Sequence, residues 1–250
     1  METLEAVAGF EVPQIIKRDG GGHVEAKGRR IIYVRTKGDD IIIIAPSPLT
    51  PYTLSLGEGW GELARSVAED MKIVPTDEGL LVGDMVSISF GDLSWSGRMP
   101  RLGFPPPESV RLATVIQAIL DLRQYSDNPL VEATYPTSLE SLVGLGPGTT
   151  PAGDDFVAGY LLGLHAIGNT FEASSIINRA AIVSRWPSWK MIEHASHGCA
   201  FFQLANLYRA MVSGLLDDVV KWSVETMRLG GSSGPSLLAG FLKSMARASC

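Results

Sequence analysis

Residues 31–44 read IIYVRTKGDDIIII, and this stretch decides the fold of the first part of the chain. Two runs of mostly β-branched residues flank the turn-forming segment 37–40, a pattern typical of a β-hairpin. Further short strands are expected at 52–56, 80–82 and 85–90. Strands this short, with turns this frequent, favour an antiparallel sandwich or a small barrel over a parallel sheet.

A helix is expected among these strands over 61–70, because Leu63, Val67 and Met71 recur at helical spacing. The chain then changes character at residues 104–107, which read FPPP, since consecutive prolines fit neither a helix interior nor a central strand. Beyond them apolar residues recur with a period of 3.6. This spacing predicts helices over 108–122, 156–168, 171–184, 189–212, 216–228 and 237–248. We therefore predict an α+β protein with a β-rich domain over 1–104 and a helical domain over 105–250.

Composition excludes several classes of protein. Apolar residues make up 45% of the chain, which is too many for a disordered protein. The 21 Lys and Arg against 27 Asp and Glu give a net charge of −6, so no basic excess is present to neutralise a nucleic acid. Cys199 and Cys250 form no CxxC pair, the first ten residues lack the pattern of a signal peptide, and no apolar stretch is long enough to cross a membrane. A cytoplasmic protein without nucleic-acid or membrane partners is expected.

Residues 144–155 read GLGPGTTPAGDD and carry the strongest functional signal. Alternating glycines permit positive φ and close approach of a ligand to the backbone, while Thr150 and Pro151 suit the N-cap and first position of a helix. The free amides of a first helical turn favour a phosphate or carboxylate. Substrate contacts are therefore expected at Gly146, Gly148, Thr149, Thr150 and Gly153, and catalytic roles at Asp154 and Asp155.

A second segment, residues 230–242, reads GGSSGPSLLAGFL and resembles the first. Both have glycine, two hydroxyl residues, a short spacer and then Ala-Gly with an aromatic residue. If the similarity is more than chance, two helix N-termini of similar build face one another across a shared ligand. Ser232, Ser233 and Gly234 are then further substrate-binding residues. The Ala-Gly pairs, together with Gly159 and Gly163, fit close helix packing instead.

These residues resemble the signatures of the AllH family. Residues 144–159 are similar to its motif G-L-G-x-G-L-T-P-S-G-D-D-x-L-x-G, and residues 230–240 are similar to its second motif, G-H-[ST]-S-G-x-D-x-L-x-G. Here Thr149 replaces a leucine, Gly231 a histidine and Ser236 an aspartate. The resemblance implies a role with the multi-subunit oxamate carbamoyltransferase of allantoin breakdown, which interconverts oxalurate plus phosphate with oxamate plus carbamoyl phosphate. The departures in the second motif suggest a different substrate or a reduced activity.

Three hypotheses follow from these motifs. The first is a protein that binds a small phosphate, carbamoyl or carboxylate compound, with loop amides stabilising charge on the transferring group. Asp154 or Asp155 would then orient an amine or hold Mg²⁺, the one cofactor left open. The second is a non-catalytic structural or regulatory subunit of such a complex. The third is a stand-alone Mg²⁺-dependent phosphoryl-handling enzyme. Partner subunits or a second copy of the chain are expected in the first two cases.

Other candidate residues carry weaker signals. His194 and His197 follow Glu193 on an expected helix and could present a metal pair, but no third ligand has diagnostic spacing, so no metal site is predicted. Cys199 is expected to be a buried small apolar residue. Arg98 and Arg101 could clamp a carboxylate or phosphate that the glycine loop holds.

Overall fold

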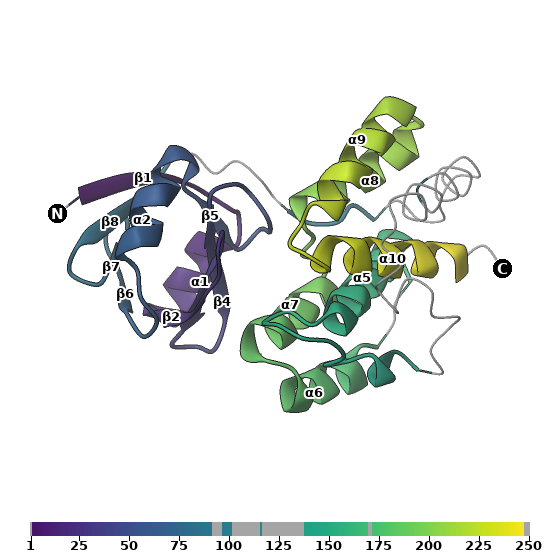
Figure 1. Cartoon of the computed structure of the whole chain (residues 1–250), viewed down its shortest axis with the longest axis horizontal. Coiled ribbons are helices and arrows are strands. Elements are labelled where there is room, and N and C mark those ends of the chain that lie inside the picture. The colour runs from purple at the N-terminus through teal and green to yellow at the C-terminus, as the bar shows by residue number, and fades with distance from the viewer. Residues whose placement is uncertain (1, 92–96, 102–115, 117–137, 170–171, 248–250) are drawn as a thin grey trace. The chain divides into compact units, whose positions relative to one another are not determined.

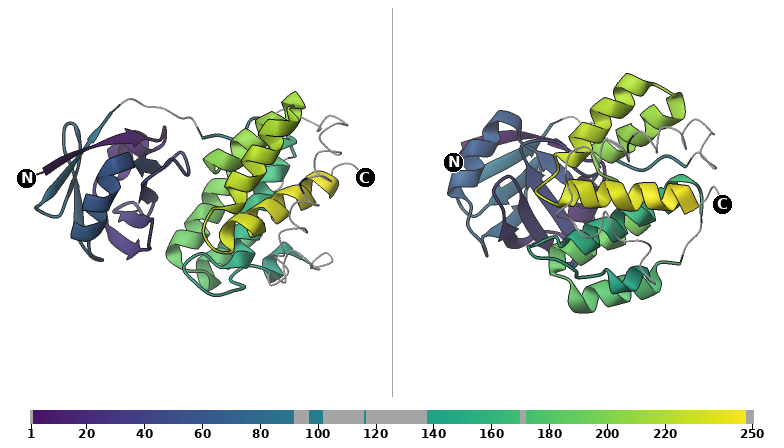
Figure 2. Two further views of the ribbon diagram at one scale, coloured as in Figure 1. Left: turned by 45° about the horizontal axis from the view of Figure 1, so that its top comes forward. Right: turned by 45° about the vertical axis from the view of Figure 1, so that its right-hand side comes forward.

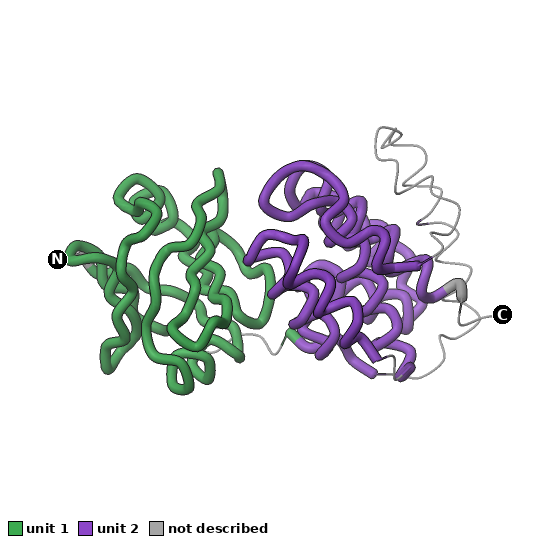
Figure 3. Tube along the Cα trace, turned by 90° about the horizontal axis from the view of Figure 1, so that it is seen from below, with its two compact units in different colours: residues 1–97 green, residues 98–250 purple. Residues whose placement is uncertain are grey.

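The computed structural model in Figure 1 describes residues 2–91, 97–101, 116, 138–169 and 172–247. The chain divides into two compact units, residues 1–97 and 98–250, coloured separately in Figure 3. The first unit is rich in strands and the second is helical, which confirms the predicted α+β class. The proline run, the domain boundary expected after residue 104 and all of the helix expected over 108–122 except Ile116 lie outside the described residues.

Within residues 2–91 the strands form a closed barrel in the order β1-β5-β4-β3-β2-β6-β7-β8. Of the two predicted architectures, the small barrel is therefore the right one. The pairs β1·β8 and β4·β5 are parallel, so the barrel is antiparallel only in part. The strands are β1 (Glu2–Ala8), β2 (Gly22–Lys27), β3 (Ile32–Thr36), β4 (Ile41–Ala45), β5 (Thr53–Ser55), β6 (Lys72–Pro75), β7 (Gly79–Val82) and β8 (Val86–Phe90).

The predicted hairpin is the pair β3·β4, in which Val34 lies opposite Ile42. Every residue of β4 is buried, so both faces of this strand are covered, because successive side chains point to opposite faces. Helix α1 (Val12–Asp19) buries Val12 and Ile15. The helix expected over 61–70 is present as α2 (Trp60–Ser66) and is shorter than predicted.

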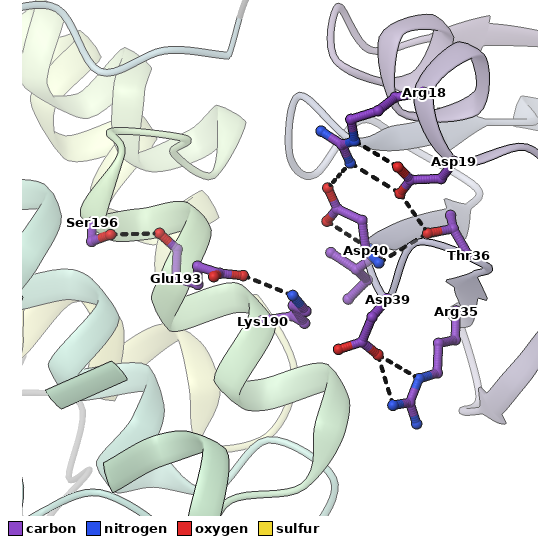
Figure 4. A network of polar contacts seen from close by, with 10 residues as sticks. Arg18, Asp19, Arg35, Thr36, Asp39, Asp40, Lys190, Glu193 and Ser196 are labelled. Atoms are coloured by element: carbon purple, nitrogen blue, oxygen red, sulfur yellow. Dashed lines mark hydrogen bonds and ion pairs between the residues drawn. The ribbon is translucent and has the colours of Figure 1, made fainter. Parts of the chain in front are cut away.

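A polar network joins the end of α1 to this hairpin, as Figure 4 shows. The guanidinium of Arg18 donates hydrogen bonds to Asp19 and Asp40, and the hydroxyl of Thr36 donates to Asp19 at 2.7 Å. The bond from Arg18 holds the pKa of Asp19 below its usual value, although burial opposes this. Charged groups thus fix the helix against the turn of the hairpin.

The helical unit contains α5 (Ala152–Ala166), α6 (Ser174–Val183), α7 (Trp186–Ser196), α8 (Phe202–Ser213), α9 (Leu216–Met227) and α10 (Ser233–Arg247). The single helix predicted over 189–212 is wrong, because the chain breaks there into α7 and α8. Gly198 takes a φ of 79° in this break, a left-handed conformation that ends a helix. None of the described helices is both long and apolar enough to span a bilayer.

Helices α5 and α10 lie side by side at the centre of this unit (Figures 1 and 2). Their contacts run in the same order along both helices, since Gly159 meets Leu237 and Gly163 meets Phe241. The helices are therefore parallel, with both N-termini at one end. A methyl group added at Gly159 would lie 1.9 Å from the carbonyl oxygen of Leu237, so the two backbones approach too closely for any larger residue.

Candidate functional site

The first glycine-rich loop precedes α5 and has the conformation that its glycines permit. Gly144, Gly146 and Gly148 have φ angles of 80°, 116° and 95°, all in the region that favours glycine. A Cβ added to Gly148 would meet no atom within 4 Å, so the backbone there is open to its surroundings. The loop therefore presents bare backbone at the start of a helix.

Several amides of this loop are available to a ligand. In the part of the chain that the structure describes, five donate no hydrogen bond: those of Gly146, Gly148, Thr149, Thr150 and Ala152. Gly144 differs, because its amide donates to Asp154. Successive free amides at a helix N-terminus form a concavity suited to an anion.

Helix α5 begins at Ala152, four residues before the range predicted from apolar spacing (156–168) and one residue after the start that the Thr150–Pro151 pair suggested. Pro151 is the N-cap residue and makes no side-chain cap, while its carbonyl oxygen accepts from the amides of Asp154 and Asp155. The prediction that Thr150 caps the helix is therefore wrong. Its hydroxyl lies instead 3.3 Å from the hydroxyl of Ser233, the first residue of α10.

That contact brings together the two motifs, which lie 83 residues apart in sequence. The Ser233 hydroxyl also lies close enough to the carboxyl group of Asp155 to lower its pKa. The two similar helix N-termini therefore lie together, and the expectation that they share a ligand stays a prediction. Among the described residues, four amides of the second loop also donate no hydrogen bond: those of Gly230, Gly231, Ser232 and Ser233.

Asp154 is enclosed by donors from its own unit. Asp154 is only 1% exposed, and its side chain accepts three hydrogen bonds. The amide of Gly144 and the hydroxyl of Ser184 donate to Oδ1 at 2.7 and 3.0 Å, and the hydroxyl of Ser188 donates to Oδ2 at 2.6 Å. The carboxylate therefore joins the glycine loop to the end of α6 and the start of α7. Sequence reasoning missed both serines, because they come from other helices and follow no local pattern.

Asp155 differs from Asp154 in its hydrogen-bond partners and in its pKa. It is 5% exposed, and among the described residues its Oδ2 atom has no hydrogen-bond partner. Burial raises the pKa of Asp155 well above its usual value; the Ser233 hydrogen bond opposes this and the charge of Asp154 adds to it. A neutral carboxylic acid is the form that this environment favours.

Gly153 and Gly234 pack within the chain. A Cβ on Gly153 would lie 1.9 Å from the Leu142 oxygen, and one on Gly234 would lie 2.1 Å from the Thr226 oxygen. Both amides donate to carbonyl groups of the chain, at Leu145 and Leu229 respectively. Substrate contact at these two glycines stays a prediction, and close packing alone explains why they are glycines.

The two motif departures differ in their surroundings. Ser236, in the place of the motif's aspartate, is fully buried in the first turn of α10. Gly231, in the place of the motif's histidine, is exposed, and an added Cβ would meet nothing within 4 Å. The chain therefore has room for a larger side chain at Gly231.

The arginine pair lies away from the glycine loop. The Arg101 guanidinium donates to His165 Nε2 at 3.2 Å, in the last turn of α5. His165 is ten residues beyond Asp155, about 15 Å along the helix axis. The pKa of His165 is lowered by burial and by the nearby charges of Arg101, Arg98 and His197. Arg101 therefore does not clamp a ligand held at the N-terminal end of α5.

Metal binding finds little support in the donor set. Among the described residues, no three His, Cys, Asp or Glu side chains gather as metal ligands, and His194 and His197 at the end of α7 have no third partner of this kind. Asp154 has both oxygens occupied, and Asp155 retains one oxygen, in a site that favours its neutral form. The two aspartates therefore leave only one carboxyl oxygen without a partner among the described residues, which is a poor donor set for Mg²⁺. Cys199 is buried, as predicted.

The fold and the paired loops define a two-part α+β protein whose helical unit presents two glycine-rich helix N-termini together. Residues 142–245 of this unit match the family model described as oxamate carbamoyltransferase subunit AllH. The match includes both loops and confirms the resemblance seen in the motifs, while the barrel lies outside it. Comparison with curated proteins and with solved structures gave no match.

Proposed function

We propose that this protein binds a small anion at the paired N-termini of α5 and α10 and serves as a subunit of an oxamate carbamoyltransferase-type enzyme. The observation that carries the proposal is the 3.3 Å approach of Thr150 Oγ1 to Ser233 Oγ, which brings two loops with free amides to one place. The family description of residues 142–245 supports the carbamoyltransferase assignment. The anion is a phosphate, carbamoyl or carboxylate compound.

The chemistry follows from the backbone and does not need lysine or arginine. Each helix N-terminus carries the equivalent of about half a positive charge, so two together supply about one. Amides that are already oriented stabilise negative charge without rearranging as it develops. A chain with net charge −6 can therefore hold an anion at this place.

In the proposed reaction, a phosphate oxygen attacks the terminal carbamoyl carbon of oxalurate. The bond from this carbon to the bridging nitrogen breaks as the new bond to the phosphate oxygen forms. The proton of the phosphate passes to that bridging nitrogen, which becomes the amide nitrogen of oxamate. The free amides of Gly146 and Gly148 would stabilise the charge on the transferring group. The Thr150 hydroxyl would donate a hydrogen bond to the anion while the Ser233 hydroxyl interacts with Asp155, and Asp154 would hold the loop in shape.

A second candidate function is a non-catalytic subunit. Asp154 favours it, because a carboxylate with three protein donors is engaged in holding the structure. In that case the chain binds the anion and supplies the site to a partner subunit on which the bond-breaking groups lie.

The experiment is a thermal-shift titration of the full chain with phosphate, carbamoyl phosphate and oxamate. A ligand at one hundred times its Kd stabilises by about 2.7 kcal/mol, which raises the Tm by about 5–11 °C for a unit of this size. Ser232→Asp adds a negative charge at an exposed loop position and should abolish the shift, whereas the uncharged Ser232→Asn should retain it. No shift with any of the three ligands, or equal shifts in the two variants, would refute the anion site. Ligand binding without turnover by the chain alone would favour the non-catalytic subunit.

A further inference from the structure

Asp155 holds the one carboxyl oxygen at the paired N-termini that the described chain leaves without a partner. The group is buried in the first turn of α5, and Ser233 of α10 acts on the same carboxyl group. A buried polar atom without a partner loses the free energy of its hydration, about 1–3 kcal/mol. Such an atom in a site of free amides points to a ligand that completes it.

We infer that Asp155 acts as a neutral carboxylic acid whose Oδ2–H donates a hydrogen bond to an oxygen atom of the bound anion. The inference rests on the proposed anion site and adds to it the protonation state and the ligand chemistry. The ligand offers an accepting oxygen of a phosphate, carboxylate or carbamoyl group. In this inference the ligand contacts Asp155 directly and not through a divalent cation, which would require the ionised carboxylate.

Charge at the site supports the neutral form. The neighbouring Asp154 already places a carboxylate beside Asp155, and a bound anion would bring a second negative charge. An ionised Asp155 would be a third, in a place where burial weakens solvent screening. Protonation removes that repulsion and turns the carboxyl group into a donor. The raised pKa of Asp155 agrees with this assignment.

Within the described residues, the elements around Asp155 bring no cation that would reverse this balance. On α10 the group that contacts Asp155 is the uncharged Ser233, and Lys243 lies ten residues further along, about 15 Å away by helix geometry. On α7 the ammonium group of Lys190 pairs with Glu193 at 2.9 Å, a contact drawn in Figure 4. Residues 144–151 contain no charged side chain. Among the described residues, Asp154 is the charged group that acts on Asp155.

The test uses oxamate as the probe, because its carboxylate stays ionised well above the usual α-carboxyl pKa of about 3.3–3.7. Isothermal titration of the full chain over a pH series, in two buffers of different ionisation enthalpy, gives the affinity and the protons taken up. Below the pKa of Asp155 in the free protein the affinity should be constant. Above it the affinity should fall tenfold per pH unit, with one proton taken up per oxamate bound.

Asp155→Asn supplies the matched control, since its amide donates a hydrogen bond without titrating. This variant should bind oxamate with an affinity that does not change with pH, and Asp155→Ala should bind at least tenfold more weakly. Wild-type binding without proton uptake at any pH, together with loss of binding in Asp155→Asn, would overturn the inference and leave the anion site standing. Oxamate binding that requires added Mg²⁺ would overturn it as well. If phosphate, carbamoyl phosphate and oxamate all fail to bind the wild type, the proposed function itself fails.

Discussion

Replacing Asp154 with alanine should destabilise the helical unit strongly, although Asp154 lies in the motif that suggests catalysis. The substitution removes the acceptor of three hydrogen bonds and leaves the amide of Gly144 and the buried hydroxyl of Ser188 without it. Hydrogen bonds to a charged group contribute about 1.5–3 kcal/mol each, and the half-buried Gly144 amide and Ser184 hydroxyl can recover part of this from water. We therefore expect the free energy of unfolding to fall by about 3–5 kcal/mol.

The measurement is urea denaturation followed by far-UV circular dichroism, with the Tm recorded in parallel. At about 2–4 °C per kcal/mol, the Tm of the unit should fall by about 6–20 °C. Ser184→Ala and Ser188→Ala are the matched controls, because each removes a single donor and should lose about 1–2 kcal/mol. If Asp154→Ala lowers the free energy of unfolding less than either control does, yet the variant no longer binds anions, then Asp154 is a ligand-binding group and not a structural one.

Three further outcomes are expected. Gly159→Ala should lower the free energy of unfolding in urea by about 2–3 kcal/mol or more, because a Cβ there would lie 1.9 Å from the Leu237 carbonyl oxygen and force the two helices apart. Gly231→Ala is the control, because its Cβ meets nothing within 4 Å and should change stability little. Gly231→His should leave the Tm within about 2 °C of the wild type, since a Cβ there meets nothing within 4 Å. The same variant should change which of phosphate, carbamoyl phosphate and oxamate gives the largest thermal shift. The pKa of His165 is lowered in the folded protein, so below about pH 6.5 the unfolded chain takes up a proton that the folded chain resists. The free energy of unfolding should therefore decrease as the pH falls below about 6.5, and it should decrease less in His165→Asn. Equal pH profiles of the two proteins would contradict this.

The sequence predicts the hairpin β3·β4 well, because its isoleucine runs are long and the turn between them is distinct. Strands β2 and β6 could not be predicted in the same way. β2 contains one buried residue, and β6 contains one buried residue and ends in Pro75. Such strands are defined by neighbours in the closed barrel more than by their own pattern. The break between α7 and α8 was missed because apolar residues continue at helical spacing across Gly198.

Some features of the candidate site could also be predicted from the sequence, and others could not. The positive φ angles of the glycine loop follow from its residues alone, and the likeness of the two motifs was enough to suggest that they lie together. The roles of Asp154 and Asp155 could not be separated, because both stand in the same motif and differ only in what surrounds them. Asp154 meets two serines from other helices, while Asp155 meets one serine of α10 and retains an oxygen without a partner in the described chain.

The parallel contact of α5 and α10 also bears on how this protein folds. Closing a loop of 83 residues to bring Thr150 to Ser233 carries an entropic cost of about 4 kcal/mol, apart from a constant, so the contact is expected to form late. A partly folded chain without this contact has no paired N-termini and no place for the anion. Ligand present during refolding would therefore leave the early steps unchanged, and would slow unfolding by trapping the chain after its last long-range contact has formed.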